Sequence, residues 1–177
     1  MYKSLLKSLI PLLLALLIQF WSCTKTKVSE QNINDIVQTA DSIRHFYSVV
    51  NATKISDPEY ARSVAEKAMK MVTVNDDQGL NANIYLIAGI ALQLNDPDSA
   101  YNYYQLAFQS AVNMQIDSIK PRILYNIAML YKIANNYQES IKMLDSSQRM
   151  ACNLNDHITM SNCYNSIGNI EHRFSPH

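Results

Sequence analysis

The chain of 177 residues is poor in the residues that form turns. It contains only 3 Gly and 5 Pro, the two residues that most strongly punctuate secondary structure. A chain so poor in turn formers is most simply all-helical. Charged residues make up 17% of the sequence, below the usual share of about a quarter, so Asn, Gln, Ser and Tyr must supply much of the surface.

The chain also lacks an excess of positive charge. Lys and Arg together number 15 and Asp and Glu number 15, which gives a formal net charge of zero. Residues 1–22 hold Lys3 and Lys7 and no acid, so the rest of the chain is slightly acidic. A nucleic-acid-binding domain normally carries a basic patch or stripe, so this balance argues against a nucleic-acid partner.

No residues have the spacing of a known catalytic or metal centre. Gly79, Gly89 and Gly168 are too far apart for a phosphate-binding loop, and the 4 His show no HExxH spacing. The run from Asn75 to Gly79 lacks the alternating ligands and the closing Glu of a calcium loop. We therefore expect a protein that binds rather than catalyses, with no cofactor and no metal.

Residues 1–22 have the pattern of a signal peptide. Lys3 and Lys7 precede a mostly apolar run from Leu9 to Trp21. This run of about a dozen residues is shorter than the roughly 20 that a membrane-spanning helix needs. The pattern predicts export, with residues 1–22 as the signal peptide; an uncleaved N-terminal anchor is the alternative.

The residues that follow the apolar run resemble a bacterial lipobox. Ser22 and Cys23 provide the small residue and the cysteine, whereas Phe20 and Trp21 depart from the usual pattern, as in the relaxed lipoboxes of Bacteroidetes. The resemblance implies acylation of Cys23 and an exported, membrane-anchored lipoprotein of the cell envelope. Residues 23–34 would form the lipidated Cys and a polar tether. The tether has no acidic run, which favours a periplasm-facing position.

A sequence pattern repeats along the rest of the chain. Three triplets of mostly small residues start about 40 residues apart, and gaps of four then three place each triplet on one helical face. Upstream of the second and third triplets, and again near the end of the chain, a small residue recurs with the same period. The triplets are Ala61, Ala65, Ala68; Ala100, Tyr104, Ala107; and Ser140, Leu144, Ser147, and the recurring small residues are Ala88, Ala128 and Gly168.

Capping residues fall where this repeat predicts helix starts. The stretches Asp57-Pro58, Asp96-Pro97 and Asn135-Asn136-Tyr137 fall between the two helices of the first, second and third units, since Asp and Asn cap helix starts and Pro suits the first turn. Asp77, Asp117 and Asp156 fall before the first helix of the next unit and are predicted N-caps as well.

These features resemble the tetratricopeptide repeat (TPR) family over residues 41–177. The third unit matches best, with Asn126-Ile127-Ala128, Tyr131, Asn136-Tyr137 and Ser140 at positions where the family usually has Asn-Leu-Gly, Tyr, Asp-Tyr and Ala. Ala91 departs from the usual aromatic. The resemblance implies an all-α, right-handed α-α superhelix (solenoid) of antiparallel hairpins with about three and a half repeats. Within a domain of residues 35–177, the units would be 41–76, 77–116, 117–155 and a half unit 156–177.

The resemblance also implies where a partner would bind. In the family the first helix of each hairpin lines a concave groove, and Tyr is frequent at recognition surfaces. We therefore predict a protein or peptide partner. The alternative is that the aromatic residues and Met129 only pack between neighbouring helices. The predicted groove residues are Phe46, Tyr85, Tyr125, Arg122, Met129, Lys132, Asn162, Asn165 and Asn169.

The sequence leaves several alternatives open. The envelope protein could be the sensory part of a signalling system, a structural brace within an envelope complex, or a non-functional remnant truncated from a longer TPR regulator. The final half unit is either a cap or the start of a missing hairpin. Cys152 and Cys163 are predicted to be buried or half-buried free thiols, although a disulfide is possible in an oxidising compartment.

Overall fold

The computed structural model describes residues 30–73 and 79–174. The predicted signal peptide, Cys23 and Asp77 lie outside these residues. The chain divides into two compact units, Met1–Thr39 and Ala40–His177. In the first unit, the described residues are those at the start of α2. The second unit holds the rest of α2 and all the later helices.

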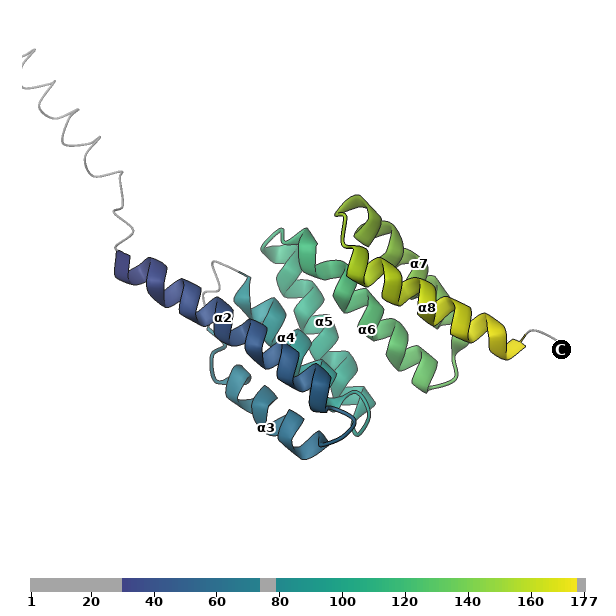
Figure 1. Cartoon of the computed structure of the whole chain (residues 1–177), viewed down its shortest axis with the longest axis horizontal. Helices are drawn as coiled ribbons and strands as arrows, with labels where there is room; N and C mark the ends of the chain where they lie inside the picture. The colour runs from purple at the N-terminus through teal and green to yellow at the C-terminus, as the bar shows by residue number, and fades with distance from the viewer. Residues whose placement is uncertain (1–29, 74–78, 175–177) are drawn as a thin grey trace, which may run out of the picture. The chain divides into compact units, whose positions relative to one another are not determined.

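The described residues form helices and no strand, which confirms the predicted all-α class for this part of the chain (Figure 1). None of these helices is both long and apolar enough to cross a membrane. The elements are α2 Glu30–Thr53, α3 Pro58–Met69, α4 Leu80–Leu92, α5 Pro97–Asn113, the 3-10 helix η1 Asp117–Ile119, α6 Lys120–Ile133, α7 Tyr137–Asn153 and α8 His157–Phe174.

Side chains cap most of the helix starts that the sequence predicts. The carboxylates of Asp57 and Asp96 accept hydrogen bonds from the backbone amides three residues later, at 3.0 and 3.1 Å. Asn136 does the same at 3.3 Å, and Asp156 at 3.1 Å. The prediction that Asp117 caps a helix as well is wrong: Asp117 is the first residue of a 3-10 turn that precedes α6, and its carboxylate pairs instead with the Lys120 ammonium at 2.6 Å.

The turns after α5, α6 and α7 share one geometry. Each contains a residue other than glycine with a positive φ, and these residues are equally spaced along the chain. The amide of the next residue then donates to a carbonyl five positions back, which is the closure of a Schellman-type helix end. The positive-φ residues are Gln115, Asn135 and Asn155, and the bonds are Ile116 to Ala111 at 2.8 Å, Asn136 to Tyr131 at 2.8 Å and Asp156 to Ala151 at 2.9 Å.

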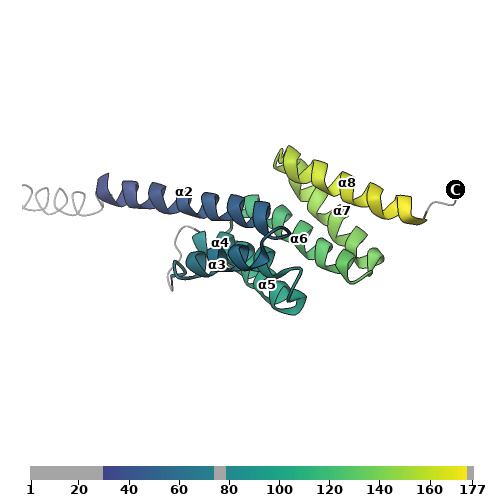
Figure 2. The same cartoon turned by 60° about the horizontal axis from the view of Figure 1, so that its bottom comes forward.

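The turn after α6 folds α7 back along it. The hydroxyl of Ser140 donates to the Ala128 carbonyl at 2.8 Å, and that of Ser147 donates to the Pro121 carbonyl at 2.7 Å. Numbers rise along α7 as they fall along α6, so the two helices are antiparallel. Figures 1 and 2 show α4 to α8 following one another, each beside the helix before it.

The small-residue triplets lie at these helix contacts. All nine of their members are buried, with no more than 5% of any of them exposed, which confirms the face predicted from the spacing of four and three. Tyr104 is the largest and passes close to α4, where Gly89 leaves room for its ring. Its hydroxyl donates to the Gln93 side chain at 3.1 Å. Burial raises the pKa of Tyr104 well above its usual value.

Candidate functional site

A pocket of about 480 Å³ brings together three of the predicted groove residues. Tyr125, Met129 and Lys132 line it from successive turns of α6. The other lining residues come from the end of α2, the end of α4, α6 itself, the turn after α6 and the end of α8. They are Lys54, Ile55, Gln93, Asn126, Ile133, Asn135 and Arg173.

The pocket lies where several helices reach their C-terminal ends. Lys54 follows the last residue of α2, Gln93 is the C-cap of α4, and Arg173 is in the last turn of α8. Helix C-termini carry partial negative charge, so cations are favoured there. The partial charge of these helix ends therefore offsets part of the cost of placing basic side chains together here.

The charge that lines this pocket has one sign. Lys54, Lys132 and Arg173 are basic, and none of the described residues that line the pocket is acidic. Burial lowers the pKa of the Lys54 ammonium, because moving a cation out of water favours its neutral form. The salt bridges found among the described residues involve other cations, namely Arg44, Lys120 and Lys142.

Arg173 is held in place at the rim of the pocket. Its guanidinium donates to the Tyr137 hydroxyl at 2.6 Å and lies 5.7 Å from the centre of the Tyr137 ring. The Tyr137 hydroxyl in turn donates to the Asn135 side chain at 2.6 Å. These neutral partners position the guanidinium without neutralising its charge, so the cation can still attract an anionic group.

Tyr125 and Met129 both line the pocket and pack. Both are half-buried against the small hydrophobic cluster that joins α6, α7 and α8. The Ser166 hydroxyl lies 3.9 Å from the Met129 sulfur. Packing between helices therefore applies to Tyr125 and Met129, and both residues also contribute surface to the pocket.

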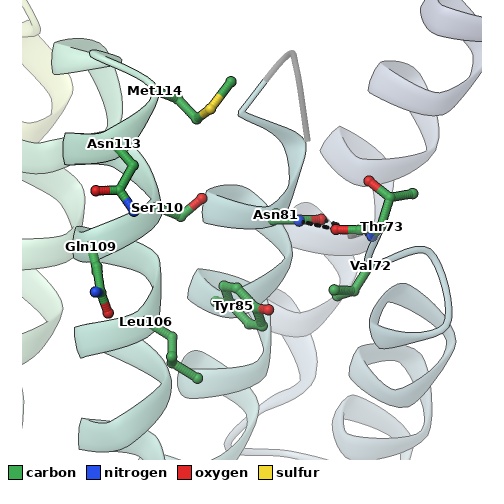
Figure 3. A pocket seen from close by; sticks show the side chains of 9 residues that line it. All are labelled: Val72, Thr73, Asn81, Tyr85, Leu106, Gln109, Ser110, Asn113 and Met114. Atoms are coloured by element: carbon green, nitrogen blue, oxygen red, sulfur yellow. Dashed lines mark hydrogen bonds between the residues drawn. The ribbon is translucent and has the colours of Figure 1, made fainter. Parts of the chain in front are cut away.

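Tyr85 lines a different pocket, of about 470 Å³, between α4, α5 and the residues that follow α3 (Figure 3). Its ring stacks on that of Tyr103 with centres 6.4 Å apart. In the same pocket, the Asn81 side chain donates to the Thr73 carbonyl at 2.6 Å and accepts from the Thr73 amide at 3.2 Å. These two bonds fix the chain after α3 against α4 and shape one wall of this pocket.

Two further predicted groove residues lie on or beside α2. Phe46 is half-buried and packs against the main hydrophobic cluster. The Arg122 guanidinium lies 5.6 Å from the centre of the Tyr47 ring, and both residues line a pocket of about 260 Å³ with Arg44. Tyr85, Arg122 and Tyr125 thus belong to three separate pockets.

The remaining predicted groove residues, Asn162, Asn165 and Asn169, are exposed on α8. The predicted lipidation site, Cys23, lies outside the described residues. None of the three asparagines lines the pocket beside α6.

The two cysteines of the last helices are free thiols in different environments. Cys163 is buried, as expected, but Cys152 is exposed, so the prediction that both would be at least half-buried is wrong for Cys152. The physical reason is the helical register. Ala151 continues the buried face of α7, and the next position along the helix therefore falls on its solvent-facing side.

Sequence reasoning missed Lys54 and Arg173, the two cations that complete the pocket lined by α6. The repeat itself could have indicated Arg173, because it lies one period after Ile133, which also lines this pocket. The same period could have indicated Lys54, because it lies 39 residues before Gln93, which lines this pocket and is itself one period before Ile133.

Within residues 30–73 and 79–174, no group of three or more His, Cys, Asp or Glu side chains is placed to hold a metal ion. Comparisons with models of known families, with curated proteins and with solved structures found no match to this chain. The resemblance to the TPR family therefore rests on the residues themselves.

Proposed function

We propose that this chain is a TPR-type scaffold of the bacterial cell envelope that binds a protein or peptide partner in the pocket lined by α6. The observation that carries the proposal is the gathering of Tyr125, Met129 and Lys132, three predicted groove residues, with Lys54 and Arg173 in one pocket. The expected anchor at Cys23 and the resemblance to the TPR family support the setting, on sequence grounds alone.

The chemistry of the pocket favours a segment that carries an acidic group. Three cations without a lining carboxylate attract a carboxylate from an acidic side chain or from the end of a chain. Tyr125 and Met129 add an apolar wall, which suits a neighbouring aliphatic or aromatic side chain. The pocket thus fits a short extended segment with one acidic and one apolar residue.

The test is recovery of partners from envelope extract by the tagged full chain in detergent. We expect the double variant Lys54→Ala and Lys132→Ala to recover at least tenfold less of its partner than the wild type, since about 1.4 kcal/mol is already a tenfold loss of affinity and loss of charge pairs at an interface typically costs a few kcal/mol. The matched control is Lys67→Ala with Lys70→Ala, two exposed lysines on and just after α3. Circular dichroism should show equal helicity in all three proteins.

A second pair of variants separates apolar contact from charge. Tyr125→Ala should also weaken recovery, whereas Tyr60→Ala, which removes a ring that is 47% exposed on α3, should not. Recovery by wild type should fall as salt rises, because screening weakens charge attraction. Equal recovery by the pocket variants and their controls would move the contact to the outer helices, and the structural-brace function would then be favoured.

A further inference from the structure

The pocket that contains Tyr85 is bounded by one face of α5, one face of α4 and the chain that follows α3 (Figure 3). We call it the Tyr85 pocket. Its volume of about 470 Å³ is within the range of small-molecule sites. Spacings of three, four and seven place its α5 residues on one side of that helix. These residues are Leu106, Gln109, Ser110 and Asn113.

The lining of the Tyr85 pocket carries no charge. All of its lining residues are described and are labelled in Figure 3, and none of them is acidic or basic. The pocket lined by α6 and the pocket beside α2 both contain Lys or Arg. An ionic ligand would lose hydration in the Tyr85 pocket without gaining an opposite charge. The lining therefore favours a neutral ligand.

The sequence repeat shows that this neutrality is particular to the hairpin of α4 and α5. Gln109 lies one period after Lys70 and one period before Arg149. The position of Gln109 is thus basic in the hairpins on either side. An amide at this position keeps a long polar side chain and removes its charge, which is what recognition of a neutral polar ligand requires.

The polar side chains of α5 are available to a ligand. Those of Gln109, Ser110 and Asn113 make no hydrogen bond to any described residue, whereas Asn81 is held by its two bonds to Thr73. A carboxamide both donates and accepts hydrogen bonds, and so does a hydroxyl. Each of the three side chains can therefore pair with a ligand hydroxyl in either direction.

Tyr85 adds an aromatic surface whose orientation is fixed. Its ring stacks on that of Tyr103, with centres 6.4 Å apart and planes 25° apart. The face of an aromatic ring is electronegative, so it attracts the C–H bonds on the apolar face of a sugar ring. Leu106, which is 44% exposed, contributes further apolar surface to the same pocket.

We infer that the Tyr85 pocket binds a short neutral saccharide. The C–H face of one sugar ring lies against Tyr85, and its hydroxyls exchange hydrogen bonds with Gln109, Ser110 and Asn113. A peptide backbone is also neutral, but each of its groups only donates or only accepts, whereas each sugar hydroxyl does both. The Tyr85 pocket is separate from the pocket lined by α6, so this binding goes beyond the partner binding proposed above.

The probes are glucose, galactose, mannose, N-acetylglucosamine, maltose and cellobiose, titrated into the full chain and followed by ligand-observed NMR. The detergent must have a head group that is not a sugar, so that it does not compete for the pocket. We expect saturable binding of at least one of these sugars in the millimolar range or tighter. This binding should not change with salt, because screening acts only on charges. No saturable binding of any of them would overturn the inference.

The double variant Gln109→Ala and Asn113→Ala should weaken that binding at least about tenfold, because it removes two or more hydrogen bonds to the ligand. Both residues are exposed, so the fold should be retained. The matched control is Asn102→Ala with Gln105→Ala, which removes the same two types of side chain from exposed positions of α5 outside the pocket. Equal binding by the wild type and the Gln109 and Asn113 variant would overturn the inference.

A third protein separates this site from the pocket lined by α6. Lys54→Ala with Lys132→Ala should bind the saccharide as the wild type does, even where it no longer recovers the protein partner. Loss of saccharide binding in this variant would place the sugar in the pocket lined by α6 and overturn the inference. Acetylated trialanine amide is the neutral peptide control and should not bind. Binding of this peptide, but of no sugar, that depends on Gln109 and Asn113 would assign the Tyr85 pocket to peptides instead.

Discussion

Among single residues, the two described glycines within helices occupy opposite environments. Gly89 in α4 faces the Tyr104 ring so closely that a Cβ atom would overlap it, whereas Gly168 in α8 faces open space. The Tyr104 ring cannot move freely, because it is fully buried and its hydroxyl is bonded to Gln93. The same substitution should therefore have opposite effects at the two positions.

Gly89→Ala should lower the free energy of unfolding by about 1–3 kcal/mol, the usual cost of overpacking a buried contact, even though Ala is the better helix former by about 1 kcal/mol. Gly168→Ala should raise it by about 0.5–1 kcal/mol, because only the helix-forming gain applies there. Urea unfolding followed by circular dichroism measures both. A Gly89→Ala protein as stable as Gly168→Ala would show that α4 and α5 can separate without cost.

At the scale of the helix, the start of α5 is sensitive to pH. A side-chain hydrogen bond from Ser99, and then the bond from the Ser99 amide, lower the pKa of Asp96 below its usual value. A carboxylate with a lowered pKa in the folded state stabilises that state above the pKa of the unfolded chain. This contribution is lost as the pH falls from about 4 through the lower, folded-state pKa.

The expected result is a steeper loss of stability in acid for the wild type than for Asp96→Asn. Asparagine at position 96 still accepts the capping hydrogen bond but does not titrate. This variant therefore removes the pH dependence of the cap and keeps the cap itself. Unfolding free energies at a series of pH values from 7 down to 3 provide the measurement. Parallel curves for the two proteins would mean that the Asp96 cap adds nothing beyond a neutral one.

Local signals explain why the individual helices could be predicted. Asp57, Asp96 and Asn136 cap through bonds that span three positions, so a short stretch of sequence contains both partners. The buried triplets follow from helical spacing alone. Asp117 was misjudged because the 3-10 turn before α6 depends on how the chain leaves α5, and a capping residue does not encode that path.

The pocket could be predicted only in part, because it depends on the arrangement of several hairpins. Tyr125, Met129 and Lys132 share α6, and the repeat placed them on one side of it. Lys54 and Arg173 come from near the two ends of the described chain; the repeat makes their positions equivalent, but the packing of the helices decides that they face one pocket. The separation of Tyr85 and Arg122 into other pockets depends on the same kind of packing.

At the scale of the whole molecule, the reactivities of the two described cysteines provide a probe of how α8 packs against α7. Cys152 is exposed, whereas Cys163 is buried between α7 and α8, and burial raises the pKa of the Cys163 thiol. Its S–H donates to the Ser147 hydroxyl at 3.3 Å. Burial between α7 and α8 therefore limits both the thiolate fraction of Cys163 and its access to reagents.

Alkylation at neutral pH should modify Cys152 at least about a hundredfold faster than Cys163, since reactivity follows thiolate fraction and access. Peptide mass spectrometry gives the two rates separately. The rate at Cys163 should rise at denaturant concentrations too low to unfold the rest of the chain, because much of α8 is exposed and elements with few buried contacts open with less free energy than the core. Equal rates at both sites in water would contradict the position of α8.

The turns after α5, α6 and α7 have a consequence for the evolution of the number of hairpins. Each one closes through its own backbone bonds, and the positive-φ residue recurs at an equal spacing. A hairpin thus carries the signals that end its own helices. Duplication or loss of the segment that encodes one hairpin would leave the remaining turns intact. The number of hairpins can therefore change in evolution without further substitutions in the turns that remain.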